Sequence, residues 1–206
     1  MSISSNTEQL KELQQQIRQC RKCGLCGYPV SPNPIFSGPA TARVMLIGQA
    51  PGPKNAVSEF PFNGGRAGKR LFDWLAQAGW TEEDFRAHHY IASVTRCYPG
   101  QNLRVPGDRV PSLVEQQLCG EWRRKELQLL NIEVIILMGK VAINLYLNVT
   151  QSLDKIIGKC YEIDRRMIVP IPHPSGASTW HLKPENKLLL DQAITHLRRL
   201  RLERNL

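Results

Sequence analysis

The sequence predicts an α/β protein, a three-layer α/β/α sandwich around a four-stranded parallel sheet. Four apolar runs, at about residues 43–48, 90–94, 133–138 and 167–171, alternate with segments whose apolar residues recur at helical spacing. Strands that alternate with helices form a parallel sheet between two helical layers. A chain of 206 residues that is 42% hydrophobic can bury such a core. We expect one domain over residues 1–206, in which residues 1–42 form an N-terminal helix and a cysteine-bearing connector.

The first half of the chain supplies two strands and three predicted helices. An N-terminal helix is expected over about residues 7–19, because its apolar residues fall on one face. The first strand, at about 43–48, follows a proline-rich connector. A helix over about 65–78 has an apolar face and ends at Gly79. Thr81 then caps a short helix that precedes the second strand.

The second half of the chain supplies the other two strands. A loop rich in proline, glycine and arginine, at residues 98–111, follows the second strand. A capping-box pattern opens a helix expected over about 112–130, and this helix contains Cys119. The third strand turns into a helix at about 140–147, and Pro184 begins the last helix after the fourth strand.

The charge balance limits the class of partner. The chain has 27 Lys and Arg residues against 18 Asp and Glu, a net charge of +9. This excess favours a polyanion such as nucleic acid, although a solvated basic face gives the same count. No apolar run reaches the length of a membrane span, and the N-terminus lacks the pattern of a signal peptide. We expect a cytoplasmic monomer, associated with the nucleoid through DNA and not with a membrane.

Six cysteines require an explanation other than disulfides, which are rare in the cytosol. Cys20 and Cys23 form a C-x2-C pair that is typical of metal sites, and Cys97 and Cys119 bracket the arginine-containing loop. Four thiolates from separate elements suit a cubane iron–sulfur cluster at least as well as zinc. Unrelated buried cysteines are the alternative. Cys26 extends the first pair and could replace one ligand.

Five short motifs follow one another in a fixed order. They are C-x2-C-x-L from Cys20, Gly-Gln-Ala-Pro-Gly at 48–52, Pro-Phe-Asn-Gly-Gly-Arg-Ala-Gly at 61–68, Val-Thr-Arg-Cys at 94–97 with Cys119 further on, and His-Pro-Ser at 173–175. In this order they resemble the uracil-DNA glycosylase superfamily, most closely its iron–sulfur branches, families 4 and 5. The resemblance implies a DNA repair enzyme that flips a deaminated base out of DNA and hydrolyses its N-glycosidic bond, leaving an abasic site. It also implies a [4Fe–4S] cluster on Cys20, Cys23, Cys97 and Cys119.

The resemblance assigns roles around the end of the first strand. Phe62 would stack on the flipped base, and His173 would donate to the base oxygen on which negative charge develops. Gln49 would orient water as well as contact the base. The remaining base contacts would come from Ala50, Gly52, Ser93 and Ser175.

Three positions depart from the family pattern. Ser93 stands where family 4 has an asparagine, as in many family 5 members. Gln49 replaces the glutamate of G-E-A-P-G, and Gly65 falls where family 5 has an aspartate. Neither family's expected position therefore holds a carboxylate. The alternative function is a catalytically weak or inactive DNA-binding iron–sulfur protein of the same fold.

DNA contacts are expected from the loop between the cluster ligands. Arg104 and Arg109 would contact phosphates, because two cluster ligands would hold their loop. Relatives fill the gap left by the flipped base with a leucine, whose position is Ala177 here. Since alanine is too small for this role, Trp180 or Leu182 is expected to serve instead.

Overall fold

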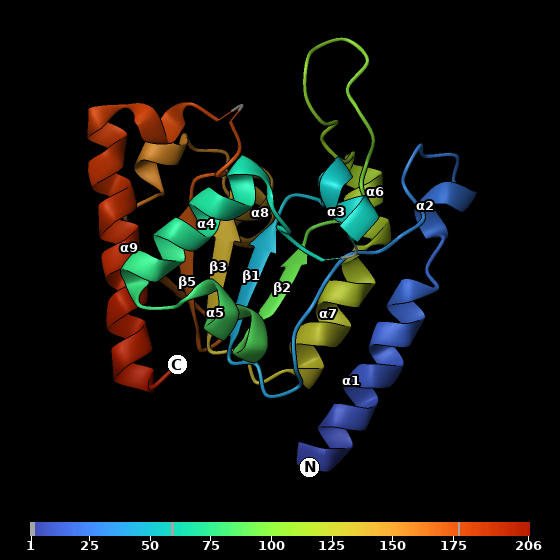
Figure 1. Ribbon diagram of the computed structural model, residues 1–206, viewed down its shortest axis with the longest axis horizontal. Coiled ribbons are helices and arrows are strands. Elements are labelled where there is room, and N and C mark those ends of the chain that lie inside the picture. The colour runs from blue at the N-terminus through green and yellow to red at the C-terminus, as the bar shows by residue number, and fades with distance from the viewer. Residues whose placement is uncertain (1–2, 59, 177) are drawn as a thin grey trace.

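The computed structural model describes residues 3–58, 60–176 and 178–206. A five-stranded sheet lies at its centre, in the order β2-β1-β3-β5-β4 (Figure 1). The strands are β1 (Val44–Gly48), β2 (Tyr90–Ser93), β3 (Val134–Met138), β4 (Tyr161–Ile163) and β5 (Arg166–Ile171). Strands β1, β2, β3 and β5 run parallel and are the four predicted strands, whereas β4 pairs antiparallel with β5. The predicted class is confirmed.

The prediction of four strands in an all-parallel sheet is wrong, because the structure adds one antiparallel edge strand, β4. β4 has only three residues, and none of them is buried, so no apolar run marks it. Asp164 and Arg165 form its turn to β5, with φ values of 49° and 62°. A two-residue hairpin turn with two positive φ angles is normally signalled by Asn-Gly. Asp-Arg gives no such signal, which is why the hairpin does not show in the sequence.

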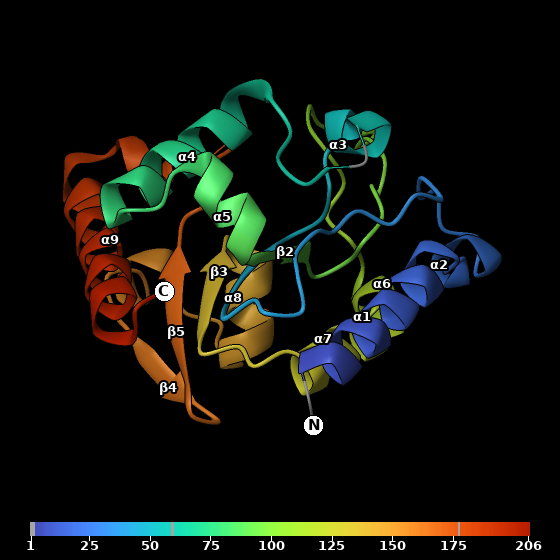
Figure 2. The same ribbon diagram turned by 60° about the horizontal axis from the view of Figure 1, so that its bottom comes forward.

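Helices cover both faces of the sheet (Figures 1 and 2). One face packs against α4 (Gly65–Ala78), α5 (Glu82–His88) and α9 (Pro184–Arg204). The other packs against α1 (Ile3–Arg18), α7 (Gly120–Leu129) and α8 (Lys140–Leu147). Shorter pieces lie in the loops, namely α2 (Lys22–Leu25), α3 (Pro53–Ser58), α6 (Leu113–Leu118), η1 (Leu153–Lys155) and η2 (Trp180–Leu182). No helix of the described ranges is both long and apolar enough to cross a bilayer.

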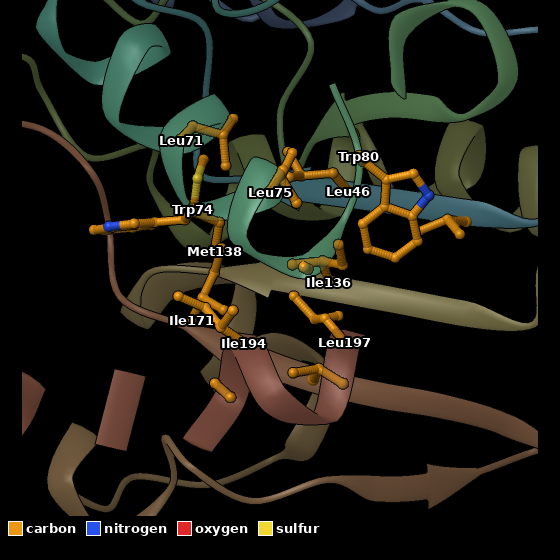
Figure 3. Close-up of a cluster of buried hydrophobic side chains, with 14 of the residues drawn as sticks. Leu46, Leu71, Trp74, Leu75, Trp80, Ile136, Met138, Ile171, Ile194 and Leu197 are labelled. Atoms are coloured by element: carbon orange, nitrogen blue, oxygen red, sulfur yellow. The ribbon is translucent and has the colours of Figure 1, made fainter. Parts of the chain in front are cut away.

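Strand β1 shows how one apolar run serves two cores. Its side chains alternate, so that Val44 and Leu46 join the α4–α9 layer while Met45 and Ile47 join the α1–α7–α8 layer. A parallel strand buried on both faces reads as a continuous hydrophobic run for this reason. Figure 3 shows the first layer, where side chains of α4 and α9 meet those of β1 and β3 (Leu46, Leu71, Leu75, Ile136, Leu197).

Three predicted helix ends are confirmed, and one predicted helix is corrected. Gly79 ends α4 with a φ of 102°, the Thr81 hydroxyl caps α5, and both bonds of the capping box at the start of α6 are present. The helix predicted over 112–130 is two helices, α6 and α7, which meet at Cys119. The N–H of Trp122 donates to the carbonyl of Cys119, three residues earlier, at 3.3 Å. This tighter 3₁₀-type bond interrupts the α-helical ladder at a predicted cluster ligand.

Candidate functional site

A cavity of about 690 Å³ opens where β1 ends. Its walls come from the turn after β1, the loop before α4, the loop after β2 and the segment after β5. This is the carboxyl end of the parallel strands, where α/β sheets bind their ligands. The cavity brings together six of the seven predicted base-contacting residues: Gln49, Ala50, Gly52, Phe62, His173 and Ser175.

Ser93 is the seventh, and it does not line this cavity. It is the last residue of β2, is buried, and packs against the end of β1. A Cβ atom added to Gly48 would lie 3.5 Å from the Ser93 hydroxyl and 3.3 Å from Cζ of Phe62. The Ser93 hydroxyl and the Phe62 ring therefore both lie beside Gly48, whose missing side chain lets that ring approach the strand end.

Phe62 is held in an unfavourable backbone conformation. Its φ of 54° is positive, which for a bulky residue persists only when the surroundings fix it. Arg86 of α5 provides this fixation, because its guanidinium donates to the carbonyls of Pro61 at 2.9 Å and Phe62 at 3.1 Å. A side chain on Gly68 would overlap the Phe62 carbonyl. The sequence pattern does not single out Arg86, since its partners are backbone atoms more than 20 residues away.

The His173 imidazole is fixed in one tautomer. The N–H of Ser175 donates to His173 Nδ1 at 3.2 Å, so the neutral ring carries its proton on Nε2. Burial lowers the pKa of His173, while the charge of Asp108 acts in the opposite direction. Arg70 of α4 steadies this segment by donating to the Pro174 carbonyl at 2.7 Å. The ring packs on Gly139, where an added Cβ would lie 3.1 Å from His173 Cδ2.

The loop predicted at 98–111 contains an ordered hairpin, residues 100–109. The N–H of Asn102 donates to Gly107 and that of Arg109 donates to Gly100, both at 2.9 Å. Figure 1 shows this hairpin rising above the strand ends beside α3. At its tip, the Asn102 side chain accepts from the N–H of Arg104, and Leu103 is 99% exposed.

The hairpin brings a carboxylate to the cavity that the motif comparison missed. Among the described residues that line the cavity, Asp108 is the one acidic side chain. The hydroxyl of Tyr98 donates to its Oδ1 at 3.0 Å. Asp108 escapes motif matching because it lies in neither position where relatives carry acids. A signal was nevertheless present, since Pro-Gly pairs at 99–100 and 106–107 mark a chain that folds back on itself.

The two arginines predicted to bind DNA have different surroundings. Arg109 donates to both carboxylate oxygens of Glu115, at 2.7 and 2.8 Å, and to the carbonyl of Pro99. Arg104 is exposed, and its guanidinium makes no hydrogen bond or ion pair with the part of the chain described here. Arg104 is thus available to an outside partner, whereas Arg109 braces the base of the hairpin.

The predicted wedge residues are only partly visible in the structure. Ala177 lies outside the described residues. Trp180 packs against the core between α4 and α9, and Leu182 is 68% exposed. Of the two substitutes, Leu182 is therefore the one that could enter the gap left by a flipped base without disturbing the core.

A second hollow, of about 50 Å³, lies between the N-terminal segment and the junction of α6 and α7. All four predicted cluster ligands line it, namely Cys20, Cys23, Cys97 and Cys119. Cys26 is exposed and does not line it. The indole N–H of Trp122 donates to Cys20 Sγ at 3.3 Å, and the N–H of Arg96 donates to Cys119 Sγ at 3.4 Å. Such donors stabilise negative charge on sulfur.

The surroundings of this hollow disfavour free thiolates. Burial and the neighbouring thiols raise the pKa of Cys23 to about 11 and that of Cys97 to about 12. A bound metal would have to supply the positive charge that makes these groups thiolates. Within the described ranges, no three His, Cys, Asp or Glu side chains converge closely enough to share a single metal ion. The four cysteines line the hollow from separate segments of the chain.

Beside the hollow lies a buried ion pair. The Arg96 guanidinium is 2% exposed and pairs with Glu126, whose side chain is 0% exposed and also accepts from the Tyr90 hydroxyl. The guanidinium of Arg123 lies nearby and donates to the Val94 carbonyl. Burial raises the pKa of Cys119, and the charges of these two arginines act in the opposite direction.

Comparison with known proteins identifies the family. The profile of the uracil DNA glycosylase superfamily matches residues 35–198. The chain belongs to this superfamily. A type-4 uracil-DNA glycosylase of Thermotoga maritima is 28% identical over 143 residues, which are 68% of this chain and 69% of that protein. Its counterpart from Archaeoglobus fulgidus is 30% identical over 143 residues, 66% of each chain.

A solved structure adds a weak structural likeness. The crystal structure of wild-type Pedobacter heparinus SMUG2 superposes with a TM-score of 0.46 at 16% identity, covering 78% of this chain and 76% of that one. The predicted resemblance to the superfamily, on its family 4 side, is confirmed by the profile and the type-4 relatives. The matched region begins at residue 35, so the match does not cover Cys20 and Cys23.

Proposed function

We propose that this protein is a DNA glycosylase that removes uracil or a related deaminated base and leaves an abasic site. One observation carries the proposal. In a chain of the uracil-DNA glycosylase superfamily, a cavity at the carboxyl end of β1 is lined by both Phe62 and a His173 whose free nitrogen carries a proton. Its volume of about 690 Å³ is ample for one flipped nucleotide.

The side chains of the cavity divide the chemistry between them. The flipped base stacks on Phe62, and the Nε2–H of His173 donates to the carbonyl oxygen that becomes anionic as the C1′–N bond breaks. A neutral donor is favourable here because no positive charge has to be buried. The backbone N–H groups of Gln49 and Ala50 supply further contacts. The N–H of Gly52 is already bonded to Asn55 at 3.2 Å, so Gly52 contributes by leaving space.

The base preference depends on the residue at position 93. Family 4 places an asparagine amide where this chain has Ser93, and Ser93 is buried beside Gly48 and does not line the cavity. An amide at that position could match uracil at two points, whereas the hydroxyl cannot. We therefore propose a broadened preference that includes other deaminated bases.

We also propose a [4Fe–4S] cluster on Cys20, Cys23, Cys97 and Cys119. In a cubane cluster each thiolate binds a different iron, so the sulfurs surround a space. Zinc instead requires its four donors around one ion at about 2.3 Å. The hollow lined by four thiols, with N–H groups directed at two of the sulfurs, supports the cluster. When bound, it would link the N-terminal segment to the start of the loop that carries the hairpin.

Single-turnover cleavage of oligonucleotides tests the function. The substrates carry uracil, hypoxanthine, xanthine or ethenocytosine, in single and double strands. We expect cleavage of at least uracil, and a loss of about a hundredfold or more in His173→Ala, the range for removing one transition-state donor. Phe62→Ala should also lose activity. His88→Ala, at an exposed site on α5, is the matched control and should cleave normally. Tight DNA binding without cleavage of any substrate would refute the enzyme and favour a DNA-binding protein.

A further inference from the structure

The hydrolysis of an N-glycosidic bond needs a group that orients the attacking water and accepts its proton. Two positions that hold acids in relatives are Gln49 and Gly65 here, and neither can accept a proton. Asp108 reaches the same cavity from a different segment, the 100–109 hairpin. The chain therefore retains a carboxylate at the site, although no motif marks it.

The geometry of Asp108 leaves one oxygen for a ligand. Oδ1 accepts from Tyr98, while Oδ2 has no hydrogen-bond donor in the part of the chain that the structure describes. A Cβ atom added to Gly52 would lie 3.8 Å from this Oδ2. Since Gly52 and Gln49 belong to one turn, Oδ2 faces the turn on which relatives carry their glutamate. His173 is near enough for the Asp108 charge to act on its imidazole.

The hairpin presents this carboxylate, which is exposed, to the cavity. Paired backbone bonds join its two sides, and the ion pair of Arg109 with Glu115 anchors its base to α6. No Lys or Arg of the described residues pairs with Asp108, so its charge is not neutralised by an ion pair. An ionised carboxylate beside the sugar also stabilises the positive charge that develops at C1′.

We propose that Asp108 is the catalytic carboxylate of this enzyme, an inference that rests on the proposed glycosylase function. Its Oδ2 accepts a hydrogen bond from the attacking water. As the water oxygen bonds to C1′, the C1′–N bond breaks and its electron pair leaves with the base. Asp108 takes the proton of the water, and the base anion is held by the Nε2–H of His173. The protonated carboxyl later returns its proton to solvent or to the departing base.

Asp108→Asn is the first test, because asparagine keeps the size and can still accept from Tyr98. We expect single-turnover cleavage to slow by about a hundredfold or more, the usual contribution of a positioned general base. DNA affinity should be retained, since a negative charge has been removed and no cation lost. Asp164→Asn is the matched control. It makes the same chemical change in the β4–β5 turn, where asparagine tolerates the positive φ.

A carboxylate exchange across the cavity is the second test. Gln49→Glu restores the acid of the relatives, so the double variant Gln49→Glu/Asp108→Asn should recover much of the lost rate. Recovery would also show that Asp108→Asn remains folded. This rescue separates chemistry from a structural role, because a damaged hairpin would not be repaired by a glutamate at position 49.

The outcomes distinguish this inference from the function on which it rests. Wild-type cleavage with an equally active Asp108→Asn overturns the role of Asp108 and leaves the glycosylase intact. Slow cleavage accompanied by lost DNA binding and no rescue also overturns it, because Asp108 would then be structural. A wild type that cleaves no lesion refutes the proposed function, and the Asp108 inference falls with it.

Discussion

The two hollows of this protein differ in what they can accommodate. The cysteine hollow measures about 50 Å³ and is lined by four cysteines together with apolar and charged residues, whereas the cavity at the end of β1 measures about 690 Å³ and is bordered by loops. A small, thiol-lined space suits a permanently held group. A large, loop-bordered space suits a ligand that enters and leaves. The hairpin and its flanking residues join them, because Cys97 lines the first hollow and Asp108 the second.

Cys97→Ser should give the largest effect, and it tests whether the cysteine hollow holds a permanently bound cluster. Loss of a cluster ligand removes metal binding that only the folded chain provides, so the free energy of unfolding should fall by about 4 kcal/mol or more. Visible absorbance in the blue, measured on purified protein with its iron content, should be lost. Cys26→Ser is the matched control, because this thiol is exposed and outside the hollow. Colourless, zinc-containing wild-type protein would refute the proposed iron–sulfur cluster.

Two arginine substitutions on the hairpin, which joins the two hollows, should have effects of intermediate size. One should lower stability and the other should weaken DNA binding. Arg109→Gln leaves Glu115, which is 1% exposed, without its bidentate partner, and should cost about 2 kcal/mol or more in thermal unfolding. Arg104→Gln should leave stability unchanged. It should instead weaken DNA binding and reduce the slope of log affinity against log salt by about 0.7 to 0.9, the value for one phosphate contact. Equal effects of both changes on the salt slope would contradict this division.

The smallest expected effect is a shift in the pKa of His173, which tests whether this side chain is a neutral donor in the β1 cavity. Because burial disfavours the charged ring, its pKa should lie below the ordinary value of 6.5. The neutral donor form then persists to lower pH than for an exposed histidine. In Asp108→Asn the opposing charge is lost, so the pKa should fall further. Nuclear magnetic resonance of the ring protons measures both values, and a pKa above 6.5 in the wild type would contradict the neutral assignment.

The cysteine hollow could be predicted almost completely from sequence. Cys20 and Cys23 are linked by fixed spacing, Cys97 follows a strand, and Cys119 lies in a segment predicted to be helical, where the structure has the junction of α6 and α7. The walls of the β1 cavity were also predictable, because the turn at 48–52 and His173 follow strand ends and Phe62 lies in a motif of the family that the chain resembles. Local patterns suffice when the chemistry depends on residues near the ends of regular elements.

The supporting residues of the β1 cavity could not be predicted in the same way. Arg70 and Arg86 act on backbone carbonyls of distant loops, and any long cationic side chain at these helix positions looks solvated in sequence. Ser93 lies near the end of the predicted strand, yet it is buried and does not line the cavity. Asp108 depends on the register of a hairpin. Each of these placements results from tertiary packing, which the local pattern does not record.

The two borders of the sheet have a consequence for how copies of this chain meet. Ser37 in the proline-rich connector pairs with Ile91 on the outer side of β2, with backbone bonds of 3.0 and 2.7 Å. On the opposite border, β4 is only three residues long and exposes Glu162. Short, charged or covered edges discourage one sheet from adding strands of another. The sheet thus resists edge-to-edge aggregation.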